Sequence, residues 1–395
     1  MRKGVFKRRF PALIGLLSLL LLLCGCWGDK EIDDLFIVTG VGLDSSTEPD
    51  KMNITFQVAK VEASSSGDSG SSSADSSTIL LESEQGTVTE AIAEFNRNGS
   101  RQIFLQHNQV ILIGSSLAEK GVTDIIDLFM RDQESRLEVA VLVVDGEAGE
   151  ALGVEMPQKK ISGLFLGKVL ESRVGISLHY RTRLLDFASR LMQKSSAAVV
   201  PMVKVVEDDG EETFEITGMA VFQSGKMTGS LSNEEVLGYI WFMGNITNSG
   251  LTVKDDAGKA SLIINQLGTK KTLKKLPDGG FSLKLSVNAV LTGNEIYGFS
   301  DMKPLELTNH LIELAQNEIR QGIEKTFQKA QQMQADIYEI GTMVHRKYPQ
   351  YWHQIEQQWG EHFASIRLEV DVKATLPNNG KVIESLKIEE QSHED

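Results

Sequence analysis

Apolar and polar residues alternate in the first part of the chain body, which is the pattern of half-buried β-strands. In residues 52–61 the apolar side chains, Phe56 among them, occupy every second position, the period that places them on one face of a strand. A glycine-containing strand is predicted before it at residues 35–44, and a third strand after it near residues 78–82. Residues 63–77, rich in serine and glycine, cannot bury a core and predict a long flexible hairpin loop.

Helical and strand patterns then follow one another. Short apolar runs such as VAVLVV in residues 137–145 predict strands that are buried on both faces of a sheet. The predicted helices are residues 87–97 and 122–130 and further segments up to about residue 194, and the predicted strands are residues 109–113, 137–145, 197–206 and 214–223. The acidic turn at residues 207–212 separates the last two strands and is the predicted domain boundary.

A long amphipathic helix is predicted in the C-terminal half of the chain. Between about residues 305 and 333, Leu311, Ala315, Ile319 and Ile323 recur every four residues, so one face of this helix is apolar and must be buried. The other predicted elements here are a helix that begins at Ser232 with the capping-box residue Glu235, strands at residues 259–267 and 281–291 around a turn at 277–280, a helix at about 335–346 and a strand at 366–374.

The N-terminus has the features of a bacterial lipoprotein signal peptide. Five basic residues precede residue 10, residues 12–23 form an apolar run, and Leu23-Cys24-Gly25-Cys26 resembles the lipobox motif. As a helix the apolar run would span about 18 Å, short of the roughly 30 Å hydrocarbon core. We therefore predict cleavage after Gly25, with S-diacylglycerol and an N-acyl group on Cys26 as the lipid anchor. An uncleaved membrane anchor at residues 10–27 is the alternative.

Together these patterns predict an α+β fold with several domains and mixed sheets, preceded by the signal peptide. The chain has 395 residues, whereas one core rarely exceeds about 250 to 300 residues. The predicted division is a signal peptide at 1–25, an N-terminal domain at 26–206 and a C-terminal domain at 213–395. Whether the C-terminal domain divides again near residue 300 stays open.

The net charge and the cysteine content limit which partners this protein can bind and which cysteine chemistry it can perform. The net charge is −14, and the first 25 residues carry five basic and no acidic residues, so the mature chain would be at −19. Such a body repels phosphate backbones and should not adhere to anionic lipid by charge. The two cysteines are Cys24 and Cys26, which excludes a disulfide framework or a catalytic thiol in the rest of the chain.

No pattern in the body identifies a catalytic, metal or cofactor site. Gly40-Val41-Gly42 lacks the third glycine of a phosphate-binding loop, and we interpret these glycines as features of a strand. His345, His353 and His362 are spaced by eight and nine residues, which fits no common zinc-ligand pattern. Gly-x-Ser-x-Gly does not occur. The sequence therefore predicts a binding or assembly protein that is not an enzyme and uses no cofactor or metal.

A cluster of aromatic residues near the C-terminus allows two interpretations. Tyr348, Tyr351, Trp352 and Trp359 could line a ligand groove or a partner surface, or they could pack helices against a sheet. We favour packing.

Four blocks of sequence resemble the Ger(x)C lipoproteins, the C subunits of spore nutrient-germinant receptors. They occur in the family's order over nearly the whole mature chain, although Gly28 is inserted in the first. The blocks are Cys26-Trp27-Gly28-Asp29 with Gly40-Val41-Gly42-Leu43-Asp44; Gln106 to Gly114 with Phe129-Met130-Arg131-Asp132; Thr217 to Phe222 with Gly225-Lys226, Leu231-Ser232 and Gly238-Tyr239; and Ala335-Asp336-Ile337 with His345 to Pro349 and Trp352.

The resemblance implies a non-catalytic, lipid-anchored subunit that helps to initiate spore germination. It implies two integral-membrane partners of the A and B type, one of them transporter-like, and a place on the outer face of the spore inner membrane of an endospore-forming bacterium. The alternatives are a solute-binding lipoprotein of a membrane transporter, which would have two βαβ-rich lobes around a cleft, and a wall-modifying enzyme.

Overall fold

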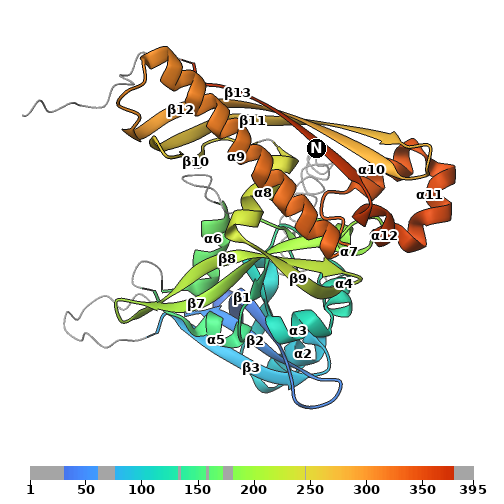
Figure 1. The fold of residues 1–395 in the computed structure, drawn as a ribbon. Helices are drawn as coiled ribbons and strands as arrows, with labels where there is room; N and C mark the ends of the chain where they lie inside the picture. The colour runs from blue at the N-terminus through green and yellow to red at the C-terminus, as the bar shows by residue number, and fades with distance from the viewer. Residues whose placement is uncertain are drawn as a thin grey trace, which may run out of the picture.

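Two β-sheets organise the chain (Figure 1). The computed structural model describes residues 31–60, 76–131, 135–156, 160–171, 181–244 and 246–377. The signal peptide, Cys26 and residues 63–75 of the predicted loop lie outside the described residues. Helices and strands mix in both halves of the chain, which confirms the predicted α+β class.

The first sheet contains nine strands in the order β3-β2-β1-β5-β6-β7-β8-β9, with β4 paired to the start of β1. The strands are β1 (Leu35–Ser45), β2 (Met52–Ala59), β3 (Thr78–Gln85), β4 (Gln102–Phe104), β5 (Val110–Gly114), β6 (Ala140–Val144), β7 (Ala198–Asp208), β8 (Glu211–Gln223) and β9 (Lys226–Ser232). Strands β1, β5, β6 and β7 are parallel to one another and form the centre, whereas β2, β3, β8 and β9 join it in antiparallel pairs.

Helices cover both faces of the parallel centre. On one face lie α2 (Val88–Asn98), α3 (Ser115–Lys120), α4 (Thr123–Arg131) and α7 (Leu184–Leu191), and on the other lie α5 (Ala148–Gly153) and α6 (Ser162–Glu171). Within β5, Ile111 belongs to the first core cluster and its neighbour Leu112 to the second. This division explains the continuous apolar runs and confirms the prediction of strands buried on both faces.

The acidic turn at residues 207–212 lies inside the first sheet. It connects β7 to β8 as a hairpin, with Asp208 opposite Glu211, and β9 then extends the same sheet. The sheet that begins in the N-terminal part of the chain therefore continues past the predicted boundary to Ser232. Judged by which residues belong to which sheet, the chain therefore divides after Ser232, before the first strand of the second sheet.

The second sheet has four strands in the order β10-β11-β12-β13 and one long helix across it (Figure 1). These elements are β10 (Ser249–Lys254), β11 (Gly258–Lys275), β12 (Phe281–Gly298), β13 (Arg367–Thr375) and α9 (Pro304–Gln332). Leu311, Ala315, Ile319 and Ile323 of α9 are fully buried against the sheet, which confirms the long amphipathic helix. The predicted strands at 259–267 and 281–291 are longer in the structure because β11 and β12 pair over almost their whole length.

Helix α8 (Asn233–Met243) joins the two sheets. Its N-cap Ser232 accepts a hydrogen bond from the N–H of Glu235, whose side chain accepts in turn from the N–H of Ser232, so the predicted capping box is confirmed. The helix packs along α9 at Gly238, where an added Cβ would lie 2.1 Å from the carbonyl oxygen of Gly322. Only glycine at position 238 permits this close crossing.

The last helices differ from the expected single helix at 335–346. They are α10 (Ile340–Lys347), α11 (Pro349–Ile355) and α12 (Trp359–Ala364). Helix α10 begins later than expected because residues 333–339 form a loop held by the side chain of Asp336. It ends before Tyr348-Pro349, as the proline predicts.

Candidate functional site

The strand Gly40-Val41-Gly42-Leu43-Asp44 lies at the centre of the first sheet, beneath α5. A Cβ at Gly40 would come within 2.7 Å of a methyl carbon of Leu152, and one at Gly42 within 3.1 Å of the backbone of Ala148. The two glycines therefore allow helix α5 to pack directly on the strand. The interpretation of Gly40-Val41-Gly42 as features of a strand is confirmed.

Asp44 ends this strand and fixes the start of α5. Its carboxylate oxygens accept hydrogen bonds from the backbone N–H groups of Ala148 (2.7 Å) and Gly149 (2.8 Å). Burial raises the pKa of Asp44, and the two backbone donors oppose that rise. Burial and the neighbouring Asp44 charge raise the pKa of Glu147 as well, and the two carboxyl groups share a hydrogen bond.

An acidic pocket opens beside this pair. It has a volume of about 440 Å³ and lies between the β2–β3 hairpin and the start of α5. The ionisable residues of its lining are Asp44, Glu82, Glu84, Glu147 and Glu150. Such a lining repels anions and attracts cations. Among the described residues, no group of three or more His, Cys, Asp or Glu side chains is placed to hold a metal ion.

Asp336 is the centre of the junction between the two sheets. Its carboxylate accepts four hydrogen bonds, from the N–H groups of Tyr338 (3.1 Å), Ile340 (3.1 Å) and Gly341 (2.6 Å) and from the indole of Trp359 (3.0 Å). Complete burial raises its pKa to about 6, and the four donors oppose that rise. One side chain thus fixes the loop before α10 and joins it to α12.

The loop around Asp336 also contacts the first sheet and its helix α7. The carbonyl of Asp336 accepts from the N–H of Ala197 (2.8 Å), just before β7, and Arg190 forms an ion pair with Glu339 (2.7 Å). The side chain of Gln223, at the end of β8, donates to the carbonyl of Gln334 (2.9 Å). These contacts come from three separate places in the first sheet region. The loop around Asp336 therefore cannot rotate relative to the first sheet, as it could if a single contact held it.

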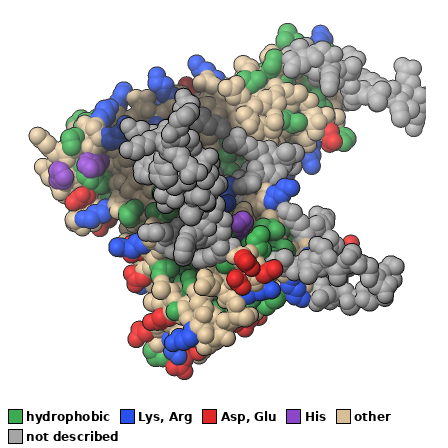
Figure 2. All heavy atoms as spheres, turned by 180° about the vertical axis from the view of Figure 1, so that it is seen from behind, with side chains coloured by type: hydrophobic (Ala, Val, Ile, Leu, Met, Phe, Trp, Pro, Cys, Tyr) green, Lys and Arg blue, Asp and Glu red, His purple; other side chains and the backbone are tan. Residues whose placement is uncertain are grey.

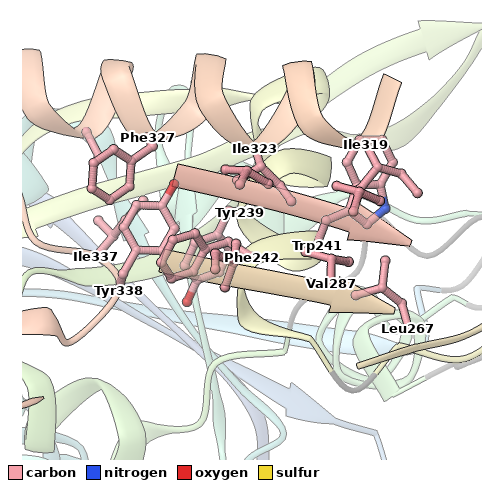
Figure 3. Packing of buried hydrophobic residues seen from close by; sticks show 14 of the residues in the cluster. Tyr239, Trp241, Phe242, Leu267, Val287, Ile319, Ile323, Phe327, Ile337 and Tyr338 are labelled. Atoms are coloured by element: carbon pink, nitrogen blue, oxygen red, sulfur yellow. The ribbon is translucent and has the colours of Figure 1, made fainter. Parts of the chain in front are cut away.

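Aromatic rings fill the space behind this junction (Figure 3). The ring of Phe242 lies 4.0 Å from that of Tyr338, and Tyr338 in turn lies 5.4 Å from Phe327 of α9. Figure 3 shows these rings close together under α9, with Tyr239 beside them. Ring contacts of this kind contribute about 0.5–1.5 kcal/mol beyond area burial, so α8, α9 and the loop form one packed unit.

The aromatic cluster of the sequence packs helices on the second sheet. Trp352 and Trp359 are buried, with rings 5.2 Å apart, and Tyr351 and Trp359 both contact Phe281 at the start of β12. The packing interpretation is confirmed. His345 stacks on Trp352 at 5.6 Å, so this histidine also has a packing role.

Sequence reasoning identified Asp336 as part of a motif but could not identify its function. Arg190 and Glu339 carry no motif and lie 149 residues apart in the chain, so no local signal reveals their ion pair. The arrangement joins the two sheets rigidly through hydrogen bonds, an ion pair and aromatic packing. It suits a protein that binds or assembles with others.

Comparison with known proteins gives two family models that together cover most of the chain. The model for the spore germination protein N-terminal domain matches residues 28–205. The model for spore germination B3/GerAC-like C-terminal domains matches residues 217–380. The gap between the two matched ranges, residues 206–216, lies in the β7–β8 hairpin.

Relatives and a solved structure agree with these matches. Spore germination proteins KC, YndF and B3 of Bacillus subtilis (strain 168) are 25%, 23% and 22% identical to this chain. The matches cover 92%, 96% and 92% of this chain and 93%, 99% and 96% of the relatives. The crystal structure of the GerBC protein matches with a TM-score of 0.55 at 17% identity, over 85% of this chain and 96% of that one, which shows a common fold.

Proposed function

This chain belongs to the Ger(x)C family of spore germination proteins, and from that membership we propose that it is the lipid-anchored C subunit of a nutrient-germinant receptor. The observation that carries the proposal is the match of both family domains, in order, behind a lipobox at Leu23 to Cys26. The proposed role is non-catalytic.

The proposed anchor is Cys26, acylated after cleavage behind Gly25. The proposal assigns membrane attachment to the lipid on this cysteine. Within the described part of the chain, no helix is long and apolar enough to cross a bilayer. Two acyl chains on one cysteine satisfy the two-signal requirement for stable anchoring. The proposed location is the outer face of the spore inner membrane.

The proposed partners are two integral-membrane subunits of the A and B type. A protein tethered at its N-terminus reaches an effective concentration in the millimolar range near its membrane partners. Weak contacts by the folded body then suffice for assembly, and a rigid junction between the two sheets keeps those contacts in a fixed geometry.

The anchor is tested by comparing wild-type spores with spores that carry Cys26→Ala. We expect the wild-type protein to incorporate labelled palmitate and to sediment with membranes, and the variant to do neither. The nutrient-triggered loss of optical density should weaken in the variant, whereas germination with calcium dipicolinate should stay intact. Cys24→Ala is the matched control, because it leaves the lipobox cysteine in place. A Cys26→Ala protein that is still acylated and fully responsive would overturn the anchor.

The receptor role is tested by deleting the gene and measuring germination across amino acids, sugars and nucleosides. Loss of the response to one nutrient class, with the calcium dipicolinate response retained, supports the proposal and names the nutrient. An unchanged response in a strain that lacks every other germinant-receptor gene would contradict it.

A further inference from the structure

The outer face of the second sheet, the face turned away from α9, concentrates positive charge on an acidic protein. Along β12 the side chains alternate, so that Leu285 and Val287 are buried under α9 while Lys284 is exposed on the outer face. The register places Lys270 and Lys274 of β11 on the same face, beside Lys284 and its neighbours.

Strand β13 adds further charge to this face. Arg367 and Lys373 alternate with the buried residues Val370 and Val372 and pair with outward positions of β12. Lys254 and Lys259 lie opposite each other at the far end of the sheet, where Lys259 also pairs with Tyr297. The acidic residues on the same face are Glu295, Glu369 and Asp371, and Asp278 of the β11–β12 turn reaches Arg367, so cations exceed anions by seven to four.

Part of this charge is already paired. Lys284 forms an ion pair with Glu369 (2.5 Å) and Arg367 with Asp278 (3.1 Å). These pairs are exposed, so their charges stay available to a surface that approaches. Lys270, Lys274 and Lys373 are exposed as well. A test can reverse these three charges without breaking the ion pairs of Lys284 and Arg367.

From this charge distribution we propose that the outer face of the second sheet docks on an anionic lipid bilayer. The face spans four strands, two of them 18 residues long, and bears cations interspersed with serine, threonine and asparagine. Anionic membranes attract such lysine clusters, by about fivefold in affinity for each residue near the surface. The acidic first sheet region does not cancel this attraction, because salt screens charges beyond about 10 Å.

The composition of the face favours lipid over a protein partner. Protein interfaces are depleted in lysine at their centre and depend on buried aromatic or arginine anchors. The large hydrophobic side chain exposed on this face is Tyr297, 62% exposed at the distal end, and tyrosine is enriched at membrane–water interfaces. The inference goes beyond the receptor role and does not depend on the acyl chains of Cys26.

The test uses the mature chain with Cys26→Ala, which cannot be acylated, and vesicles of phosphatidylcholine with and without phosphatidylglycerol. We expect co-sedimentation with the anionic vesicles at a low salt concentration of about 0.1 M, where charges beyond about 10 Å are still screened, its loss at high salt, and none with the neutral vesicles. The triple variant Lys270→Glu, Lys274→Glu and Lys373→Glu should lower the partition coefficient at least tenfold, and the same three positions changed to Gln should give an intermediate loss.

The matched control changes the net charge equally but elsewhere. Lys120→Glu, Lys194→Glu and Lys204→Glu alter three exposed lysines of the first sheet region and should leave vesicle binding within about twofold of wild type. Equal losses in the two triple variants, or no binding to anionic vesicles at low salt, would overturn the proposal. So would salt-dependent self-association without vesicles that the sheet variant abolishes, since the partner would then be a second copy. Failure here leaves the Cys26 anchor untouched, because that anchor is tested by acylation.

Discussion

The two sheet regions of this protein differ in how many faces of the sheet are covered by helices. In residues 31–232, helices cover both faces of a parallel centre, and β5 and β6 are buried at every position. In residues 233–377, α9 covers one face of the second sheet, and no described helix packs on the other face. The first region therefore exposes loops and strand ends, whereas the second exposes a flat sheet surface as well.

Charge follows the same division. Residues 31–232 contain 31 acidic and 17 basic residues, whereas residues 233–377 contain 17 acidic and 15 basic residues. Seen from behind, the acidic side chains gather on the lower part of the molecule and several Lys and Arg side chains on the upper part (Figure 2). A net charge of −14 therefore describes neither region, because the second region is nearly neutral and carries many of its cations on one face.

The largest expected effect breaks the packing of the second region. Gly238→Val should lower the free energy of unfolding by at least about 3 kcal/mol, because its side chain would meet the carbonyl of Gly322 and the hydroxyl of Thr326. Urea unfolding followed by circular dichroism measures the loss. The matched control is Gly268→Ala in β11, where an added Cβ meets nothing within 4 Å. A loss for Gly238→Val no larger than the control's would show that α8 and α9 do not need this close contact.

The next effect concerns the junction and depends on pH. The folded-state pKa of Asp336 is about 6, above its ordinary value of 3.8. The stability linked to its proton is therefore present below about pH 4 and is lost as pH rises through about 6. The non-titrating variant Asp336→Asn should therefore be less stable than wild type by an amount about 2 kcal/mol larger at pH 4.5 than at pH 7.

Urea unfolding of both proteins at the two pH values measures this difference. Glu339→Gln serves as the control for the junction, because it removes a half-exposed charge beside Arg190 without touching the bonds of Asp336. A difference between wild type and Asp336→Asn that is equal at both pH values would contradict the raised pKa of Asp336.

A smaller effect belongs to the first region. Asp44→Ala leaves the N–H groups of Ala148 and Gly149 without their carboxylate acceptor and should cost about 2 kcal/mol. Asp145→Ala, at an exposed position close in sequence, should stay within about 0.5 kcal/mol of wild type. Thermal unfolding of both variants measures the difference, and equal melting temperatures would show that Asp44 does not stabilise α5.

The smallest expected effect concerns the open sheet face. Lys284→Gln removes the ion pair with Glu369, in which both side chains are about half exposed, and should leave the urea midpoint close to that of wild type, because water and salt screen the pair. Urea unfolding at low and high salt measures this. A loss as large as that of Asp44→Ala would mean that the exposed face contributes to stability as strongly as a buried site, and the contrast between the two regions would then fail.

Much of the secondary structure could be predicted from the chain alone because its signals are local. The apolar runs of β5 and β6 and the four-residue stripe of α9 each reflect a face that must be buried. The alternation in β2 predicted its apolar face, but the strand is not half-buried, because Thr55 and Gln57 on the other face are buried as well. The capping box at Ser232 and the proline at position 349 set helix ends by backbone chemistry within four residues. Shorter elements such as β4, β9 and β10 were not predicted, because a few residues carry too little periodicity.

From the sequence alone we could predict the longer helices and strands, the α+β class and, through blocks such as Gly40 to Asp44, the family. Tertiary structure alone decided that residues 211–232 extend the first sheet and that Asp336 closes the junction to Ala197 and Trp359. It also decided that lysines scattered from Lys254 to Lys373 lie on one face. The physical reason is that periodicity and capping act between residues a few positions apart, whereas sheet order, buried hydrogen bonds and surface charge depend on residues that only folding brings together.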